Sequence, residues 1–488
     1  RAAALAALAS ATLYAALAGF SVPTRRALIM VAVAMGVVLL QLRWRRSDAL
    51  VLALWGVLLW DPLSVMEAGF WLSFAAVAVI LYAMGGQGER RRHWWRRGRL
   101  HGAVALGLAP LSLLFFQQQP LLAPVANLVA VPWVSLLVVP MVLAGALCLP
   151  WAPGTGQFLL QGGADLLALL WPVLEHLAAW PAVRWQHAPP PWSAAVSIAG
   201  LGLLLAPRGL PGRWLGALWL LPLFFSLPPS PAPGSVRFTL LDVGQGLAAV
   251  LQTRHHVLVY DTGPRYSASF DAGGAVLVPF LRSQGVERVN LLIVGHGDND
   301  HLGGARSLLR EMPVERILSS VPSRLAGARP CHAGQAWQWD GVSFRMLHPG
   351  ADSELDGNDA SCVLHVSTKG PGILLTGDIE KAAERALLRR EGQWLRARLL
   401  VAPHHGSRTS SSEPFIDAVA PEHVLFPVGY RNRYRLPAEA VVARYRRLGA
   451  RLWDSARHGA ISVVLDAGGG LSPPRAHRLV QRRYWHGG

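Results

Sequence analysis

The segment His296-Gly297-Asp298-Asn299-Asp300-His301-Leu302-Gly303-Gly304 has the composition of a metal-binding loop. It places four imidazole or carboxylate side chains within six residues, directly after the apolar stretch 290–294. Divalent cations select these groups, and a tight loop lets alternate residues converge on one or two ions. A solvated loop that is rich in His and Asp by chance is the alternative interpretation.

Two further clusters of the same kind follow apolar stretches later in the chain. Thr376-Gly377-Asp378 ends a strand expected near 372–376, and His404-His405-Gly406-Ser407 follows a strand expected near 398–402. Polar side chains at strand ends are typical of functional sites in layered α/β domains. Three such clusters in one domain favour a metal site over surface polarity.

The composition of the 488-residue chain predicts two unlike halves. Leu, Ala, Val and Trp dominate before about Pro228, whereas hydrophobic and charged stretches alternate after it. A hydrophobic fraction of 52% with only 15% charged residues is ordinary when half of a chain lies in lipid. A chain of this length also exceeds what one hydrophobic core usually supports. We expect a polytopic membrane domain (1–227), a Pro-rich linker (228–235), an α/β hydrolase domain (236–466) and a basic C-terminal tail (467–488).

The membrane half contains stretches of membrane-spanning character. They lie near 2–20, 27–42, 49–60, 68–84, 102–117, 121–149, 193–206 and 214–227. A further stretch, 158–180, carries Asp165 and Glu175 among Leu and Trp. We expect it to lie at the membrane interface or to line a cavity.

Two polar residues of the membrane half are candidates for a channel, because polar groups are costly in lipid. Glu67 and Asn127 each lie amid apolar sequence. Pro124 and Pro132 flank Asn127 and predict a broken helix, which is tolerated where it lines a cavity. Ordinary hydrogen bonding between helices is the alternative for each residue.

Basic loops predict the orientation, because Lys and Arg gather on the cytoplasmic side of a membrane. The loop 89–99 is the most basic, and the loops 43–46 and 208–213 fall on the same side. This places the C-terminal domain on the outer, periplasmic face of a bacterial inner membrane. Arg25 and Arg26 fall on the outer side in this count and disagree with it.

The formal charge of +17 has two interpretations of comparable weight. Basic loops can hold membrane spans in place, or Arg can attract a polyanion by neutralising phosphates. Cys331 and Cys362 can form a disulfide if their domain faces an oxidising compartment. The chain begins with Arg1 rather than Met and runs directly into an apolar stretch, so we expect a fragment of a longer protein.

The order His-x-Asp-x-Asp-His, Thr-Gly-Asp and a downstream His resembles the metallo-β-lactamase superfamily. That superfamily usually begins with His-x-His-x-Asp-His, so Asp298 replaces a His. With this replacement, the domain resembles that of the ComEC competence family. It also resembles the family in three further segments: Asp242-Val243-Gly244-Gln245-Gly246, Asn358-Asp359-Ala360-Ser361-Cys362 and His404-His405-Gly406-Ser407. In the membrane half, Trp71-Leu72-Ser73-Phe74 and the segment 124–132 resemble the same family. Leu247 departs from it, because many members have an acidic residue there.

The resemblance implies an αββα metallo-β-lactamase-like sandwich with two divalent metal ions. His296 and Asp298 would hold the first ion. Asp300 and His301 would hold the second with a histidine of the 404–405 pair, and Asp378 would bridge both. We favour His404 as the ligand and His405 as a catalytic or substrate-contacting residue beside Asp300 and Asp378. Three carboxylates among six ligands make Mn²⁺ a candidate beside Zn²⁺.

A second set of residues is expected to orient ligands or to meet substrate. Its members are Asp242, Gln245, Asp261, Asn358, Ser361 and Ser407. Asp242 and Asp261 are expected to orient loops or ligands rather than to bind metal. Ser361 and Ser407 could donate hydrogen bonds to phosphate or simply occupy turns.

The resemblance also implies a function. The membrane spans would form a channel for single-stranded DNA during natural transformation, and the external domain would hydrolyse DNA phosphodiesters of the strand that is not imported. DNA, the lipid bilayer and other DNA-uptake proteins are the partners this implies. One alternative is a membrane-anchored metallohydrolase of a small phosphoester or lipid without a channel. Another is a DNA channel whose metal domain binds DNA without cleaving it.

Overall fold

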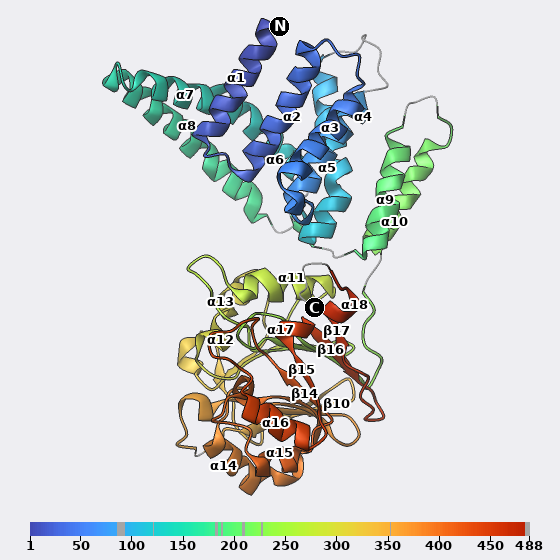
Figure 1. Ribbon diagram of the computed structural model, residues 1–488, viewed down its shortest axis with the longest axis vertical. Coiled ribbons are helices and arrows are strands. Elements are labelled where there is room, and N and C mark those ends of the chain that lie inside the picture. Colours follow the sequence, from blue (N-terminus) through green and yellow to red (C-terminus); the bar gives the residue numbers. More distant parts are fainter. Residues whose placement is uncertain are drawn as a thin grey trace. The chain divides into compact units, whose positions relative to one another are not determined.

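The computed structural model describes residues 1–483 except 85–92, 121, 181–183, 187–188, 207–209, 226–227 and 352. The chain forms two compact units, Arg1–Pro228 and Pro229–Gly488, which are described separately (Figure 1). Three features expected from the sequence lie wholly or partly outside the described residues. They are the basic loop 89–99, Arg208 and the end of the tail 467–488.

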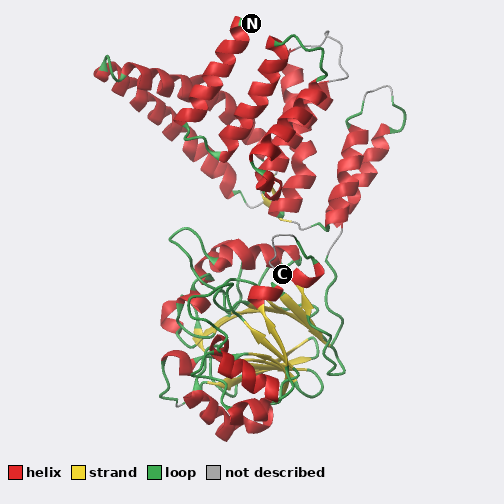
Figure 2. Cartoon of the chain, viewed as in Figure 1, coloured by secondary structure: helices red, strands yellow, loops and turns green. Residues whose placement is uncertain are grey.

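The first unit is built of apolar helices (Figure 2). They are α1 (Ala2–Leu17), α2 (Val22–Leu39), α3 (Arg46–Trp60), α4 (Ala68–Met84), α5 (His93–Phe116), α6 (Ala123–Trp133), α7 (Val139–Cys148), α8 (Pro153–Ala179), α9 (Pro191–Leu204) and α10 (Leu221–Phe225). A short strand pair, β1 (Gln118–Pro120) and β2 (Arg184–Gln186), accompanies them. Within the described part of the chain, three helical segments are long and apolar enough to cross a membrane: Val22–Leu39, Val125–Cys148 and Pro153–Ala179. The third contains all but the last residue of the stretch 158–180 that we expected at the interface, so its composition also permits a spanning position.

The predicted break of the helix around Asn127 is wrong. Helix α6 continues through a π-helical turn, η2 (Val134–Val138), into α7. Pro132 has no backbone N–H, so the regular hydrogen-bond ladder is interrupted there and a wider turn follows. The helix therefore adjusts its pitch without ending, and Asn127 is exposed on its surface.

The second unit is a sandwich of two β-sheets with helices on both outer faces (Figures 1 and 2). The first sheet has the order β17-β16-β3-β4-β5-β6-β7-β8, and the second has the order β15-β14-β13-β12-β11-β10-β9. The strands of the first sheet are β3 (Val236–Leu240), β4 (Ala249–Gln252), β5 (Val257–Tyr260), β6 (Leu291–Val294), β7 (Ile317–Ser319), β8 (Arg329–Pro330), β16 (Ile461–Leu465) and β17 (Arg475–Ala476). Those of the second are β9 (Ala336–Trp339), β10 (Val342–His348), β11 (Val363–Ser367), β12 (Gly372–Leu375), β13 (Ala397–Val401), β14 (His423–Phe426) and β15 (Arg451–Asp454).

Successive side chains of each strand point to opposite faces of its sheet, which gives one hydrophobic core between the sheets and one on each outer face. Phe238 of β3 and Phe344 of β10 belong to the core between the sheets. The outer face of the first sheet packs against α11 (Val278–Ser283) and α13 (Ala305–Glu311). The outer face of the second packs against α14 (Lys381–Glu391), α15 (Glu413–Val419) and α16 (Glu439–Arg447). This is the αββα arrangement expected for the domain.

Parallel strands bring the polar clusters to one edge. Strands β5, β6 and β7 run parallel in the first sheet, and β12, β13 and β14 run parallel in the second. The carboxyl ends of parallel strands lie at the same edge of a sheet. The loops after β6, β12 and β13 therefore carry the metal-binding loop, Asp378 and the histidine pair together.

The predicted boundary at residue 466 is wrong, because the segment after it belongs to the fold. Strand β17 pairs with β16, and Arg478 of α18 (His477–Val480) contacts Asp242 with Nη2 2.5 Å from Oδ2. The linker also packs on this unit, since the N–H of Gly234 donates to the carbonyl of Asp340. Basic composition alone does not reveal these long-range contacts.

Candidate metal centre

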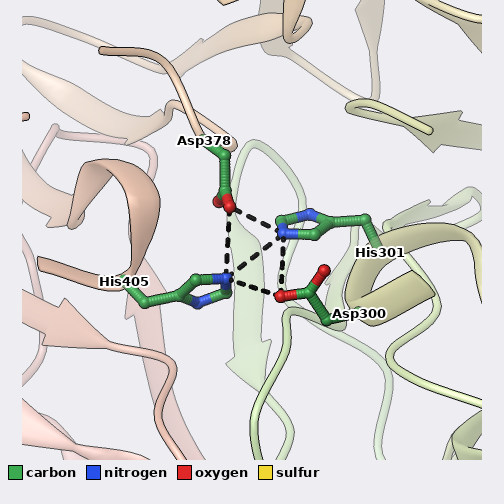
Figure 3. A group of neighbouring side chains, drawn as sticks. All are labelled: Asp300, His301, Asp378 and His405. Atoms are coloured by element: carbon green, nitrogen blue, oxygen red, sulfur yellow. Dashed lines mark hydrogen bonds and ion pairs between the residues drawn. The ribbon is translucent and has the colours of Figure 1, made fainter. Parts of the chain in front are cut away.

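Asp300, His301, Asp378 and His405 converge at this edge of the sandwich (Figure 3). Nε2 of His301 lies 3.1 Å from Oδ1 of Asp378 and 3.3 Å from Nε2 of His405. Nε2 of His405 lies 3.2 Å from Oδ2 of Asp300 and 3.4 Å from Oδ2 of Asp378. Ligand atoms about 2.1 Å from a tetrahedral ion are themselves about 3.4 Å apart. The four side chains therefore have the spacing of ligands around one ion.

Asp261 determines which nitrogen of His301 faces the cluster. Its Oδ2 accepts a hydrogen bond from Nδ1 of His301 at 2.7 Å, and its Oδ1 accepts one from the N–H of Gly295 at 2.6 Å. Both Asp261 and His301 are fully buried. A carboxylate only accepts, so Nδ1 carries the proton and the lone pair of Nε2 is directed at the cluster. The role of orienting residue predicted for Asp261 fits this geometry.

A carbonyl group fixes His405 in the same way. Nδ1 of His405 lies 2.8 Å from the carbonyl oxygen of Pro427, so it donates and leaves Nε2 to face the cluster. His405 lies in the turn η9 (Pro403–Gly406), where His404 and His405 have φ of 47° and 53°. Left-handed backbone is unfavourable for residues with a Cβ and is often found at functional sites. This turn aims the two neighbouring imidazoles in different directions.

The electrostatics of the cluster suit a cation. Burial disfavours the charged forms of His301 and His405, but the neighbouring carboxylates, above all Asp378, favour them more strongly. As a result, the pKa of His405 is raised to about 9 and the pKa of His301 is raised well above its usual range. Burial alone would raise the pKa of Asp378, yet His301 and His405 hold it well below its usual range. Protons on the imidazoles thus compensate the carboxylates, and a divalent ion can replace them.

His296 provides an independent test of the fit to metal. It is 2% exposed, and neither of its ring nitrogens has a hydrogen-bond partner among the described residues. Its Nε2 lies 3.7 Å from Oδ2 of Asp298 and 3.8 Å from Oδ2 of Asp378. Leaving a buried polar group unsatisfied costs about 1–3 kcal/mol. A metal ion between His296, Asp298 and Asp300, which form a second group of potential ligands, would give Nε2 of His296 a partner.

The preference for His404 over His405 as the inner histidine does not agree with the geometry. Nε2 of His404 lies 3.8 Å from Oδ2 of Asp378, while its Nδ1 lies 3.1 Å from Oε1 of Glu380. Its side chain is 24% exposed, whereas that of His405 is 2% exposed. His404 therefore lies at the rim of the centre. The sequence shows two adjacent histidines but not the left-handed turn that distinguishes them.

The serines have different surroundings. Ser361 is fully buried; its hydroxyl donates to the carbonyl of Asn358 at 2.7 Å and accepts from the N–H of Asp378 at 3.2 Å. It therefore positions Asp378, which favours the turn role over the phosphate contact that the sequence also allowed. Ser407 is half-buried, and its Oγ lies 3.0 Å from Oγ1 of Thr409 beside His404.

The segment Asp242–Gly246 supports the metal-binding loop through its backbone. Gly246 has φ of 141°, and a Cβ there would lie 2.5 Å from the carbonyl oxygen of Asp300. The N–H of Leu247 donates to that carbonyl, while the Leu247 side chain is buried in the inner core. Gln245 accepts from the N–H of Gly429 at 3.3 Å. The absence of an acid at position 247 therefore removes no side chain from the cluster.

Some supporting contacts could not be identified from the sequence. Oδ1 of Asp359 accepts from the N–H groups of Glu380 and Ala383 and so caps α14 behind Asp378. The carbonyl of Pro427 is a backbone group whose role depends on folding. Arg324 donates to the carbonyl of Gly297 at 2.6 Å. Each contact joins segments that are distant in sequence, so no local pattern predicts it.

In the first unit, the channel candidate Glu67 has an ion-pair partner. Oε2 of Glu67 lies 3.7 Å from Nη1 of Arg26, whose side chain is 8% exposed. Arg26 is one of the two residues, with Arg25, whose position disagreed with the charge-based orientation. Buried charges are usually paired, so the ion pair with Glu67 explains the position of Arg26. Arg26 therefore need not mark the side of the membrane on which its loop lies.

A disulfide joins Cys331 to Cys362, with Cα atoms 6.0 Å apart. The sequence permitted this pair without establishing it. The N–H of Cys362 donates to the carbonyl of Gly295, directly before His296. The bond therefore ties the segment after β8 to a strand that flanks the metal centre.

Comparison with known families gives one match in each unit. The family described as competence protein matches residues 1–211. The metallo-beta-lactamase superfamily matches residues 241–429, which include all four residues of the central cluster. The superfamily match supports a metal-dependent hydrolase.

Curated relatives align with both units. The chain is 39% identical to competence protein ComA of Neisseria gonorrhoeae over 98% of its own length and 66% of the relative. It is 32% identical to the uncharacterized protein YcaI of Escherichia coli (strain K12), over 98% and 64%, and 26% identical to ComE operon protein 3 of Bacillus subtilis (strain 168), over 92% and 62%. The chain thus spans just under two thirds of the length of these relatives. With a competence region followed by a metallo-β-lactamase domain, it belongs to the ComEC family of competence proteins.

Proposed function

We propose that this chain is an inner-membrane DNA-uptake protein whose C-terminal domain hydrolyses DNA phosphodiesters with the help of metal ions. The competence match supports the uptake role, and the superfamily match supports the hydrolase. One observation carries the hydrolase assignment: the Nε2 atoms of His301 and His405 lie 3.3 Å apart between two carboxylates, with both Nδ1 atoms engaged elsewhere. Two Nε2 atoms at this distance, with both Nδ1 atoms donating elsewhere, are typical of histidines that bind one metal ion.

The residues divide between two proposed ions. His296 and Asp298 would hold the first, and Asp300, His301 and His405 the second, with Asp378 shared. Two bound divalent ions would supply a hydroxide near neutral pH and stabilise negative charge on the phosphoryl oxygens. Asp261 and the Pro427 carbonyl hold the two imidazoles in the required tautomer. Asp298 is 69% exposed, so substrate can approach from this side.

A phosphodiester fits the centre better than a β-lactam. Asp298 stands where lactamases usually have a His. Three of the proposed ligands, Asp298, Asp300 and Asp378, are therefore carboxylates. Oxygen-rich sites bind harder cations, and this favours Mn²⁺ beside Zn²⁺. Within DNA uptake, the phosphodiesters of the strand that is not imported are the proposed substrate.

Cleavage of linear DNA by the purified full chain in lipid nanodiscs tests the proposal. Activity should require Mn²⁺ or Zn²⁺, disappear with chelator and fall by at least 100-fold in Asp300→Ala. Asp417→Ala removes an exposed acid of α15 and serves as the matched control. Metal-dependent cleavage that survives in Asp300→Ala would place the activity elsewhere.

Two other functions remain distinguishable by the same preparation. A folded chain that binds metal and DNA without cleaving either strand would be a channel with a binding-only domain. A chain that hydrolyses bis(p-nitrophenyl) phosphate but neither cleaves nor binds DNA would be a small-molecule metallohydrolase. The first alternative retains an uptake role, and the second does not.

We further propose that the C-terminal domain lies on the outer face of the inner membrane. The distribution of basic loops supports this orientation, and the Cys331–Cys362 disulfide is typical of an oxidising compartment. Arg254→Cys, at an exposed turn before β5, should react with a membrane-impermeant maleimide on intact spheroplasts. Labelling only after lysis would reverse the orientation.

Single-stranded DNA transport through the first unit is also a proposal, with Glu67 and Asn127 as candidate channel residues. Glu67 is 44% exposed on its side chain although it pairs with buried Arg26, so it can meet a second group. Glu67→Gln should lower the transformation frequency while leaving DNA cleavage unchanged. Unchanged transformation in Glu67→Gln and Asn127→Ala would remove both residues from the pathway.

A further inference from the structure

Exposed aromatic side chains gather on two loops of the second unit. Among the described residues of this unit, five Phe, Tyr or Trp side chains are more than a third exposed: Tyr266, Phe270, Trp394, Tyr430 and Tyr434. All but Trp394 belong to the loops 264–270 and 429–436. Aromatic groups are usually buried, and their exposure in clusters marks binding sites.

The loop 264–270 is attached to the metal-binding loop. Asn299 donates to the carbonyl of Arg265 at 3.1 Å and accepts from its N–H at 3.3 Å. The N–H of Gly304 donates to the carbonyl of Gly263. Tyr266, which is 49% exposed, donates its hydroxyl to the carbonyl of Val243 at 2.6 Å. These contacts fix the aromatic side chains of this loop next to the segment that carries Asp300 and His301.

The loop 429–436 is attached at both ends to the turn that carries the inner histidine, at His405 and at Gly406. Before the loop, the carbonyl of Pro427 accepts from His405; after it, the N–H of Ala438 donates to the carbonyl of Gly406 at 2.9 Å. Asn432 closes the loop, donating to the carbonyl of Leu436 at 2.7 Å and accepting from its N–H at 2.9 Å. The loop is therefore held in one conformation at the rim of the centre.

Three arginines make this second loop positively charged. Arg431, Arg433 and Arg435 are exposed, and none of them forms an ion pair with a carboxylate in the part of the chain that the structure describes. Two of the guanidinium groups lie over tyrosine rings, Arg431 at 5.2 Å from the Tyr430 ring and Arg433 at 4.8 Å from the Tyr434 ring. Unpaired guanidinium groups beside exposed rings suit a ligand with both phosphates and planar groups.

We propose that the loops 264–270 and 429–436 hold single-stranded nucleic acid across the metal centre, with bases against Tyr266, Tyr430 and Tyr434 and phosphates against the arginines. This deepens the proposed function and rests on it. Stacking requires base faces that a duplex conceals, so a single strand or an unpaired end is favoured. An anionic lipid headgroup would also attract arginines, but it supplies no planar group for the rings.

Binding of a fluorescein-labelled oligothymidylate to the full chain tests the proposal. The chain is placed in nanodiscs of zwitterionic lipid with chelator, so that neither cleavage nor anionic headgroups interfere. The first variant, Arg431→Gln/Arg433→Gln/Arg435→Gln, replaces the loop arginines. The second, Tyr430→Ala/Tyr434→Ala, replaces the tyrosines. A charge-matched control, Arg254→Gln/Arg288→Gln/Arg316→Gln, replaces exposed arginines near the starts of β5, β6 and β7, at the opposite end of the first sheet.

The two loop variants should weaken binding differently. Loss of stacking by each tyrosine should raise Kd by about 5- to 150-fold, with little change in salt dependence. Loss of three phosphate contacts should lower the slope of log K against log salt by about 2, at about 0.7 for each contact on a single strand. The control should change neither quantity. Affinity and salt slope equal to wild type in both loop variants would overturn the proposal.

Hydrolysis of bis(p-nitrophenyl) phosphate separates this inference from the proposed function. This small diester reaches the metals without the loops, so the loop variants should hydrolyse it like wild type while cleaving single-stranded DNA more slowly. If wild type hydrolyses neither substrate, the proposed function fails, although loop-dependent binding would still support the strand site. If wild type cleaves DNA and the loop variants cleave it equally well, the strand site fails and the nuclease stands.

Discussion

Replacing Asp261 by Asn should remove the hydrogen bond that orients His301 in the metal centre, with almost no change in side-chain volume. The two carboxylate oxygens accept from different donors: Oδ2 from Nδ1 of His301 at 2.7 Å, and Oδ1 from the N–H of Gly295 at 2.6 Å. An amide has only one acceptor oxygen. If that oxygen keeps the Gly295 contact, the NH₂ group faces His301 and forces its proton from Nδ1 to Nε2. The nitrogen that faces the cluster then loses its lone pair.

The size of the effect follows from these contacts. Loss of a partner behind a metal-binding histidine typically lowers metal affinity or activity by about 10–100-fold. The buried hydrogen bond to a charged group contributes about 1.5–3 kcal/mol to stability. Both should be measurable in the full chain, metal affinity by titration with Mn²⁺ or Zn²⁺ against a competing chelator, and stability by the melting temperature.

Asp359→Asn is the matched control for this substitution. Oδ1 of Asp359 alone accepts from both Glu380 and Ala383, at 2.8 and 3.0 Å, so the amide oxygen of Asn can keep both contacts. This control should bind metal within about threefold of wild type, well below the loss expected for a metal-supporting residue. If Asp261→Asn also binds metal and cleaves DNA like wild type, the assignment of Asp261 as the group that orients His301 is incorrect.

Three further results are expected. His405→Ala should abolish metal-dependent cleavage, whereas His404→Ala should retain metal binding and lose at most part of the rate; the reverse order in a metal titration would restore His404 to the inner position. Replacing Cys331 and Cys362 by Ser should lower the free energy of unfolding by about 3–4 kcal/mol, because the bond closes a loop with a sequence separation of 31; an unchanged melting temperature would contradict this. Hydrogen bonds to the carboxylate of Asp340 outweigh its burial and lower its pKa, so its contribution to stability is present above about pH 4 and lost as the pH falls further. The difference in melting temperature between wild type and Asp340→Asn should therefore shrink below that pH, and a constant difference would argue against the pKa shift.

The sequence predicts the elements of the second unit well, because apolar strands alternate with polar clusters. His296, Asp300, His301 and Asp378 were identified from their place after such strands, and the structure brings them together. The choice between His404 and His405 could not be made in this way. It depends on left-handed backbone at two non-glycine residues, which no side-chain pattern announces.

Other errors have a similar physical origin. The basic segment after residue 466 reads as a solvated tail, but Arg478 pairs with Asp242, more than two hundred residues earlier. Pro124 and Pro132 predict a helix break around Asn127, yet a π-helical turn absorbs the lost hydrogen bond. Glu67 was identified as a costly polar group, while its partner Arg26 was assigned to a loop. Each outcome depends on a tertiary contact or on a local change of helix pitch.

Metal content and DNA cleavage, measured on one preparation of the full chain, test the central claim most directly. After dialysis against Mn²⁺ or Zn²⁺, wild type should retain two ions per chain and cleave DNA. Asp378→Asn should retain fewer ions and lose cleavage, because its carboxylate contacts His296, His301 and His405. Wild type that holds no metal, or that cleaves DNA equally well in chelator, would contradict the account.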